Sequence, residues 1–339
     1  MTIKNIVLSG GGHTLYQSLG IIQTLEKNDI WKIENIEKIY GTSAGALLGA
    51  ILCLKFDWET LNDYFLNRPW HDVFNIDINT IFSMFSKKGF FNKNQIELSF
   101  KPLLHAKDLS LDITLKEFYE YSNIELHIFT FEVNYFKLED ISYKTNPDLS
   151  LITALYMSSS LPIMFSPVCI DDKCYIDGGV ATNYPLIFCI EQNNNLDEIL
   201  GIKNVFDVEC NSTCACEANN NNIKSDVTIN ENTSETTTVN KKINNINEDS
   251  SLLDFFISFF QKVILKLNIN NLNHNIKHEI NCNCKTVTYT FFNKFVSSVE
   301  LRKELLENGI ECGNQYVEKI FEKPDKYESD DKPEKGKKI

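Results

Sequence analysis

The chain contains 339 residues, of which 43% are hydrophobic and 23% are charged, a composition typical of a globular protein with a sizeable core. Its formal net charge is -13, because 46 Asp and Glu residues outnumber 33 Lys and Arg residues. Nucleic acids and anionic bilayers attract positive surfaces, so this balance argues against a nucleic-acid partner and against general electrostatic adsorption to a membrane. The length fits one large domain or two small ones.

The N-terminal residues show no secretory signal, because 1–5 lead directly into a strand-like run instead of a charged start followed by an apolar stretch. We therefore predict a cytoplasmic protein that contacts membranes, if at all, from their surface. In this reducing compartment the ten cysteines are expected to be free thiols. No stretch reaches the 18 or more apolar residues of a membrane-spanning helix, so no transmembrane segment is expected.

The cysteine spacing bears on whether the chain holds a metal. Four cysteines lie in or beside apolar segments and are predicted to be buried: Cys53, Cys169, Cys174 and Cys189. Two further groups are Cys210, Cys214 and Cys216, and then Cys282 and Cys284 behind His274 and His278. Their C-x3-C-x-C and C-x-C spacings differ from the paired C-x2-C motifs of zinc sites, so we expect no metal.

Strand-like and helix-like segments alternate from residue 3 to about residue 200, the order of a mostly parallel sheet covered by helices. Residues 57–106 are aromatic-rich and mostly helical. The predicted strands cover 3–9, 36–40, 124–135 and 286–292, and the predicted helices cover 15–27, 44–54, 150–160, 252–267 and 297–321. The pattern predicts an α/β fold.

The composition changes after residue 208, where a tract rich in Asn, Thr, Ser and Glu begins. Such a tract buries too little apolar surface to offset the entropy of ordering it. We therefore predict a disordered low-complexity insertion over 209–250. The flanking segments 3–208 and 251–322 are expected to form one fold, followed by a charged disordered tail over 323–339.

Two aromatic-rich stretches allow two interpretations each. The first contains Phe82, Met84, Phe85, Phe90 and Phe91, and the predicted helix 252–267 contains Phe255, Phe256, Phe259 and Phe260. Aromatic residues at helical spacing more often pack in a core, but they also cap acyl pockets or dip into a bilayer. Both interpretations stay open from the sequence.

The motif Gly41-Thr42-Ser43-Ala44-Gly45 stands between a predicted strand and a predicted helix. In that context a Gly-x-Ser-x-Gly turn exposes the serine hydroxyl at a sharp corner, and the following helix N-terminus favours developing negative charge. The motif therefore indicates a nucleophilic serine, Ser43, flanked by Gly41 and Gly45. A tight glycine-lined turn is the structural alternative.

The run Ser9-Gly10-Gly11-Gly12-His13 follows the first predicted strand. Consecutive glycines let successive backbone N–H groups point into one concavity, which suits a phosphate or an oxyanion. The G-x-x-x-x-G-K-[ST] and G-x-G-x-x-G patterns of nucleotide-binding loops are both absent, since Leu15 occupies the place of the last glycine. An oxyanion site is therefore the favoured interpretation, and His13 is not assigned a catalytic role.

The motif Asp177-Gly178-Gly179 follows an alternating, strand-like run. An acid at a strand end, beside glycines that allow close backbone approach, is suited to accept the proton of a nearby serine. By itself the motif is more typical of an ordinary Asp-Gly turn.

The three motifs in this order resemble the patatin-like phospholipase family, in which a glycine-rich loop, a Gly-x-Ser-x-Gly elbow and a later Asp-Gly-Gly or Asp-Gly-Ala motif build a Ser-Asp dyad. Two more stretches are similar to the family: the Ser-rich and Pro-containing segment 157–168, and the last helix 301–320 with its Leu-Leu-Glu-Asn-Gly turn. The resemblance extends from residue 3 to about 322. It implies a three-layer α/β/α fold with a mostly parallel central sheet.

Carried over by position, the resemblance implies that Ser43 is the nucleophile and Asp177 the base. The backbone amides of Gly10, Gly11 and Gly12 would form the oxyanion hole. The family often has a Lys or Arg followed by Gly where this chain has Thr14 and Leu15, which keeps the backbone donors but removes a cation.

The expected reaction is hydrolysis of fatty-acyl esters in phospholipids or glycerolipids through an acyl-enzyme, without cofactor or metal. A Ser-His-Asp esterase is the rival enzyme, because His274 and His278 follow Asp177 in the chain, in a predicted polar connection. A third possibility is an inactive lipid-binding or regulatory protein of the same fold. The head group, acyl position and protein partners are not predicted.

Overall fold

A computed structural model describes residues 2–192, 195–206, 255, 256, 259, 275–285 and 289–321. Its strands are β1 (Asn5–Leu8), β2 (Lys38–Thr42), β3 (Gly89–Phe91), β4 (Glu125–Glu132), β5 (Lys137–Ile141), β6 (Ile163–Phe165), β7 (Val168–Ile170), β8 (Lys173–Asp177), β9 (Ile199–Phe206) and β10 (His278–Cys284). Its helices are α1 (Thr14–Lys27), α2 (Ala44–Cys53), α3 (Trp58–Asn67), α4 (Trp70–Val73), α5 (Ile78–Lys87), α6 (Lys93–His105), α7 (Leu115–Ser122), α8 (Leu151–Ser159), α9 (Leu186–Gln192), α11 (Tyr289–Ser297) and α12 (Val299–Phe321).

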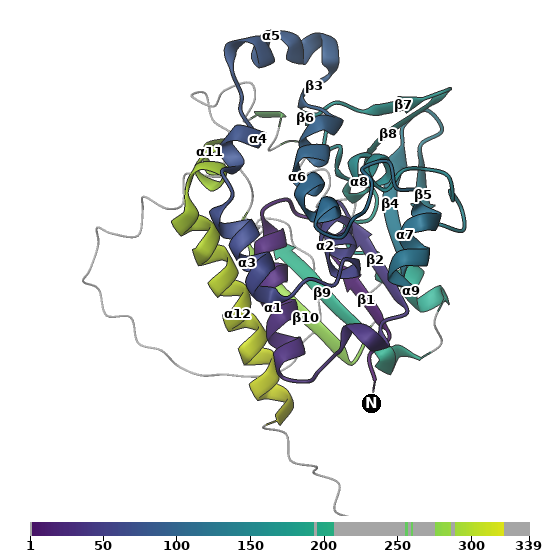
Figure 1. Ribbon diagram of the computed structural model, residues 1–339, viewed down its shortest axis with the longest axis vertical. Helices are drawn as coiled ribbons and strands as arrows, with labels where there is room; N and C mark the ends of the chain where they lie inside the picture. The colour runs from purple at the N-terminus through teal and green to yellow at the C-terminus, as the bar shows by residue number, and fades with distance from the viewer. Residues whose placement is uncertain are drawn as a thin grey trace, which may run out of the picture.

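The central sheet has the order β10-β9-β1-β2-β4-β8-β7, and β5 pairs with β4 beside this path. Neighbours from β10 to β4 run parallel, whereas β5, β7 and β8 pair antiparallel. Both faces of a parallel sheet must be covered, and successive side chains of β1 pack against helices on the two opposite faces. Ile6 and Leu8 pack among helices that include α1 and α2, whereas Val7 packs with Leu186 and Cys189 of α9. The predicted three-layer α/β/α fold is confirmed (Figure 1).

Strands β2 and β8 approach each other along the same edge of β4. β2 runs parallel to β4 and ends with Thr42 opposite Phe129, whereas β8 runs antiparallel and ends with Asp177 opposite Thr130. β5 takes the other edge of β4 over the same residues. The ends of β2 and β8 therefore meet at adjacent positions of one strand.

Helix α12 packs tightly along α1 on the outside of the sheet, as Figure 1 shows. A Cβ added at Gly309 of α12 would collide with the carbonyl group of Gln17 in α1, and one added at Gly20 would collide with Leu306. The absence of side chains at these two glycines permits the close helix contact.

One predicted strand is wrong. Residues 289–297 form the helix α11, and the strand next to β9 is β10, which begins at His278. Ile280, Cys282 and Cys284 of β10 are buried and alternate with exposed Asn281 and Asn283. Thiols and amides give this alternation little hydrophobic contrast, which explains why the sequence pattern did not reveal it.

The predicted free, buried state of Cys169 and Cys174 is also wrong. The two residues face each other across the β7–β8 hairpin and form a disulfide, with Cys169 exposed and Cys174 half-buried. Directly opposed positions of an antiparallel pair bring the two Cα atoms to 4.1 Å. The predicted burial of Cys53 and Cys189 is confirmed.

Several predictions fall on residues outside the described ranges: the insertion, most of the predicted helix 252–267, the tail 323–339, His274, Cys210, Cys214 and Cys216. Within the described ranges, no helix combines the length and the apolar character needed to cross a bilayer. The same ranges contain no group of three or more His, Cys, Asp or Glu residues placed to hold a metal ion.

Candidate active site

Ser43 stands at the corner between β2 and α2. Its backbone has φ 54° and ψ -121°, a conformation that L residues rarely adopt and that is typical of a strained nucleophile turn. Gly45 permits the corner, since a Cβ there would collide with the carbonyl group of Leu8 in β1. A Cβ at Gly41 would lie 2.6 Å from the backbone nitrogen of Ala46. The two glycines thus let the corner fold against β1.

Asp177 lies within hydrogen-bond reach of Ser43, because β2 and β8 end beside each other. The Ser43 hydroxyl donates to Oδ2 of Asp177 at 2.6 Å. The second oxygen, Oδ1, accepts from the backbone N–H of Gly179 at 2.7 Å. Gly178 fits only without a side chain, because a Cβ would collide with the carbonyl group of Phe129. One carboxylate oxygen is therefore held by the chain and the other faces the serine.

The surroundings of Asp177 bring the pKa of its carboxyl group closer to neutral pH. The residue is 4% exposed. Burial raises the pKa of its carboxyl group to about 6, although the hydrogen bonds from Ser43 and Gly179 act in the opposite direction. A base whose pKa lies near the working pH combines a useful deprotonated fraction with useful proton affinity.

The glycine loop lies next to this pair, and its first glycine is already engaged. Gly10 donates its N–H to the carbonyl oxygen of Asn183 at 2.9 Å, which corrects the prediction that all three glycine amides are available to an oxyanion. Gly11 is half-buried and Gly12 is exposed, with φ 151° and 61° respectively. Among the described residues, the N–H groups of Gly11 and Gly12 donate to no acceptor. These two amides remain available to an oxyanion.

Two asparagines that the sequence analysis did not single out hold the loop. The carbonyl oxygen of Gly10 accepts from Nδ2 of Asn204 at 3.0 Å and from Nδ2 of Asn183 at 3.2 Å. Asn204, near the end of β9, also donates to the Thr14 hydroxyl at 2.7 Å. Thr14 is fully buried. At the position where the family often has a Lys or Arg, this chain therefore has a buried neutral side chain that is hydrogen-bonded to Asn204.

The Ser-rich segment around the end of α8 supports both members of the pair. The hydroxyl of Ser158 accepts from the backbone N–H of Ser43 at 2.9 Å and donates to the carbonyl oxygen of Phe129 at 2.6 Å. The carbonyl oxygen of Ser160 accepts from the N–H of Asp177 at 3.0 Å. The segment therefore fixes the backbone on both sides of the Ser43–Asp177 contact.

His13 is buried beside the glycine loop and packs edge-on against Phe291, with ring centroids 4.8 Å apart. Burial lowers the pKa of its imidazole to about 4, and among the described residues neither ring nitrogen has a hydrogen-bond partner. The ring is therefore neutral at physiological pH and packs as an apolar group.

The histidine required by a Ser-His-Asp site is not supplied by His278. This residue begins β10, and the register through β9 and β1 places it level with Ile39 of β2, four residues before Ser43. That offset corresponds to about 13 Å along the strand, in addition to the three strand spacings between β10 and β2. His278 instead contacts the Tyr316 hydroxyl through Nδ1 at 3.0 Å.

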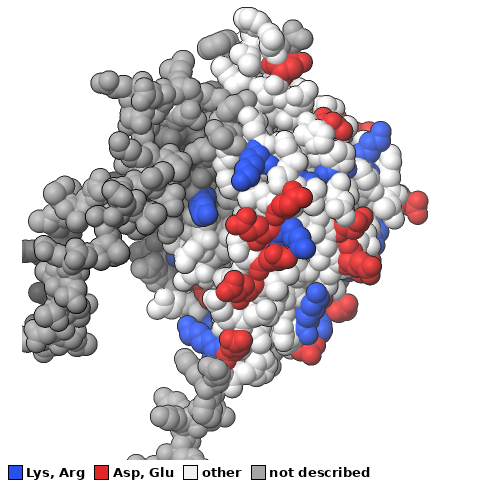
Figure 2. All heavy atoms as spheres, turned by 90° about the vertical axis from the view of Figure 1, so that its left-hand side faces the viewer, with Lys and Arg blue, Asp and Glu red and all other residues white. Residues whose placement is uncertain are grey.

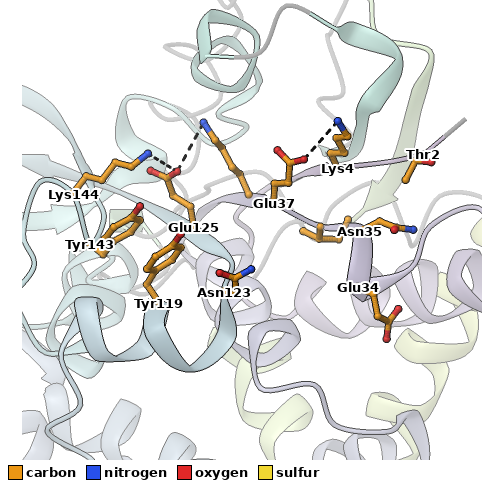
Figure 3. Close-up of a pocket in the computed structure, with 12 residues that line it drawn as sticks. Thr2, Lys4, Glu34, Asn35, Glu37, Tyr119, Asn123, Glu125, Tyr143 and Lys144 are labelled. Atoms are coloured by element: carbon orange, nitrogen blue, oxygen red, sulfur yellow. Dashed lines mark hydrogen bonds and ion pairs between the residues drawn. The ribbon is translucent and has the colours of Figure 1, made fainter.

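A polar pocket of about 520 Å³ opens at the opposite end of the sheet, where β1, β2 and β4 begin (Figure 3). Its charged side chains pair with one another: Lys144 lies 2.8 Å from Glu125, Lys38 3.9 Å from Glu125, and Lys4 3.6 Å from Glu37. The pocket contains none of the predicted site residues. Ser43 and Asp177 are thus separated from the pocket by the length of the strands.

Comparison with known proteins identifies the family. The profile of the family described as Patatin-like phospholipase matches residues 6–190, more than half of the chain. "Probable lipid hydrolase 463L" of Invertebrate iridescent virus 6 is 28% identical over 194 residues, or 56% of this chain and 64% of that protein. "Uncharacterized protein R571" of Acanthamoeba polyphaga mimivirus is 27% identical over 210 residues, or 59% of this chain and 65% of that protein. The chain thus spans slightly less than two thirds of these relatives.

Among solved structures, VipD from Legionella pneumophila is similar with a TM-score of 0.49 and 18% identity. The similarity covers 94% of this chain and 67% of the VipD chain.

Proposed function

The chain belongs to the patatin-like phospholipase family, and on this premise we propose that it is a lipid acyl hydrolase of the phospholipase A type that uses Ser43 and Asp177 as a dyad. The observation that carries the proposal is the 2.6 Å hydrogen bond from the Ser43 hydroxyl to Asp177 at a strained strand-to-helix corner. A serine hydroxyl needs a base within this reach to become a nucleophile.

In the proposed cycle, Asp177 accepts the Ser43 proton while Oγ attacks the ester carbonyl. The N–H groups of Gly11 and Gly12 stabilise the oxyanion, with Gly10 holding the loop in place. The proton held by Asp177 passes to the leaving alcohol, and an acyl-enzyme remains on Ser43. Water, activated by Asp177, then releases the fatty acid and restores the serine.

The proposed substrates are fatty-acyl esters of phospholipids or neutral glycerolipids. This proposal is supported by the family and by the name of the viral relative, a probable lipid hydrolase. The Thr14–Asn204 hydrogen bond bears on the choice of head group. Because position 14 holds a neutral threonine and not a cation, it does not select an anionic head group beside the loop.

The test combines a covalent probe with product analysis. A fluorophosphonate should label Ser43 in the parent protein, and a Ser43→Ala variant should neither be labelled nor release fatty acid from a mixed-lipid suspension. Ser110→Ala, which removes an exposed serine outside the site, is the matched control and should behave like the parent.

Equal fatty-acid release by the parent and Ser43→Ala would contradict the proposal. Failure to label folded parent protein would instead favour an inactive lipid-binding member of the family. Loss of turnover in a double His274→Ala, His278→Ala variant would favour a histidine-dependent site.

A further inference from the structure

Helix α5 (Ile78–Lys87) exposes apolar side chains that the described part of the chain does not cover. Phe82 is 77% exposed, Ile78 70% and Ile81 47%. Ile78 and Phe82 are one helical turn apart, and Ile81 is adjacent to Phe82, so the three side chains share one face. We call these three residues the α5 apolar face.

The basic charges of α5 lie at its C-terminal end, and one acidic residue, Asp77, caps its N-terminus. The helix contains no Asp or Glu, and it ends with Lys87 followed by Lys88, both exposed. Elsewhere the chain has a large acidic excess, with a formal net charge of -13. An apolar face with a basic end is the pattern of helices that lie in the interfacial layer of a membrane.

The position of α5 connects it to the candidate active site. β3, directly after α5, pairs with β6, and β6 follows the α8 segment that hydrogen-bonds to Ser43 and Asp177. In Figure 1 α5 lies at the top of the molecule, whereas α12 ends at the bottom. In Figure 2 the top carries little charge apart from an acidic patch, and acidic and basic side chains mix further down.

We propose that the α5 apolar face is the element by which this protein docks on a lipid bilayer, with Lys87 and Lys88 contacting anionic head groups. The proposal rests on the proposed function for its choice of a lipid surface, because a hydrolase of aggregated lipids must reach the interface. Docking through α5 brings the active-site end of the fold, and not the polar pocket end, towards the bilayer.

A bilayer fits α5 better than a second protein does. A stable protein interface buries about 800 Å² on each partner, usually over a broad patch. The described side chains of this ten-residue helix include three exposed apolar ones, too few for such a patch. Three side chains are sufficient for interfacial insertion, because each buried Phe or Ile stabilises the inserted state in proportion to the apolar area it removes from water.

The test measures vesicle binding without turnover, in a Ser43→Ala background. Sedimentation with vesicles of phosphatidylcholine and phosphatidylserine should show that Phe82→Asp weakens binding about tenfold or more. Phe321→Asp is the matched control, because Phe321 is 68% exposed at the other end of the molecule, and it should bind like the parent. A Lys87→Glu, Lys88→Glu variant should lose the preference for phosphatidylserine over pure phosphatidylcholine vesicles.

Several outcomes would overturn docking through α5. They are unchanged binding by Phe82→Asp, an equal loss in Phe321→Asp, or a dimer of the parent that Phe82→Asp dissociates in the absence of lipid. Circular dichroism and thermal unfolding establish that the variants are folded.

The hydrolase proposal and the proposal of docking through α5 can be contradicted independently of each other. In an otherwise unmodified chain, Phe82→Asp should keep the parent's turnover of a short, monomeric soluble ester while losing turnover of vesicle lipid. If neither ester is hydrolysed but vesicle binding still depends on Phe82, the hydrolase proposal fails and docking through α5 stands.

Discussion

The two ends of the central sheet hold buried carboxylates in opposite electrostatic surroundings. Glu125, at the start of β4, is 5% exposed, and Asp177, beside the other half of β4, is 4% exposed. Burial by itself raises the pKa of Glu125, but His127 and Lys144 outweigh burial and lower the pKa to about 2. Within the described part of the chain the donors to Asp177 are neutral, and burial raises its pKa to about 6. Burial raises the pKa of both carboxyl groups, and the net shifts are opposite because cations lie beside Glu125.

The cations at the Glu125 end form a packed cluster. Nδ1 of His127 lies 2.8 Å from Oδ2 of Asp140, and its ring stacks on Tyr40 with centroids 4.3 Å apart. Burial lowers the pKa of His127, but Asp140 and Glu125 outweigh it and raise the pKa. This end stabilises its charges, whereas the Asp177 end leaves a carboxylate ready to take a proton.

Asp177→Asn gives the largest expected effect and acts on activity and stability in opposite directions. Turnover should fall about 10³- to 10⁴-fold, because the serine loses its base. At pH 8 the free energy of unfolding should rise by about 1–3 kcal/mol, because a tenfold change in proton affinity corresponds to about 1.4 kcal/mol. Initial rates and urea denaturation measure the two effects.

The stability gain from Asp177→Asn should vanish at low pH. The folded pKa of Asp177 is raised from 3.8 to about 6, so its ionisation costs stability fully above pH 6 and not below pH 3.8. A loss of stability at pH 8 would show that the ionised carboxylate is compensated by a partner we have not identified.

Asn204→Ala should lower kcat about tenfold or more with little change in KM, because the glycine loop loses the donor to Gly10 and Thr14. Asn204→Asp, which keeps the size but not the two donated hydrogen bonds, should not restore kcat. Steady-state kinetics on a soluble ester, with thermal unfolding as the folding control, measure the effect. An unchanged kcat would remove Asn204 from the positioning of the loop.

The pH dependence should sharpen the contrast between the two carboxylates. Asp177 must be deprotonated to act as a base, so kcat/KM should fall about tenfold per pH unit once the pH drops below about 6. Glu125 keeps its charge down to about pH 2, so it should not contribute to that fall. A rate profile that stays flat down to pH 4.5 would contradict a raised pKa at Asp177.

Glu125→Gln should change stability in the opposite direction to Asp177→Asn and should have the smallest effect on turnover of the variants considered. The folded pKa of Glu125 is lowered, so its stabilisation is complete above pH 4.5 and is lost as the pH falls towards 2. The variant should lose about 1–3 kcal/mol of unfolding free energy at pH 7, and the loss should shrink in acid. Turnover by the folded variant should match the parent, and a tenfold drop would mean that the two ends are coupled.

The local backbone geometry at Ser43 can be predicted from the sequence, because it depends on short-range rules. The Gly-x-Ser-x-Gly corner at Ser43 requires small neighbours, and the chain shows them within five residues. The alternation of strands and helices likewise predicts the layered fold. These features depend on the chain near each residue.

The remaining features depend on distant pairing. Asn204 reaches the glycine loop across 194 positions of sequence, and no local pattern marks it. The carbonyl oxygen of Asn183 accepts the hydrogen bond from the Gly10 N–H only because the segment after β8 lies next to the loop. The Cys169–Cys174 disulfide depends on the register of β7 and β8, which the spacing of the two cysteines does not specify. Such contacts need the three-dimensional arrangement.

The meeting of β2 and β8 on one edge of β4 determines when in folding the site becomes competent. The serine corner forms from neighbouring segments, but its base arrives from 134 residues further along the chain. Contacts of such long sequence separation form late, because the intervening loop must be ordered first. A growing or partly folded chain thus exposes Ser43 without a base. If Ser43 and Asp177 act as the proposed dyad, hydrolytic activity therefore depends on completion of the central sheet.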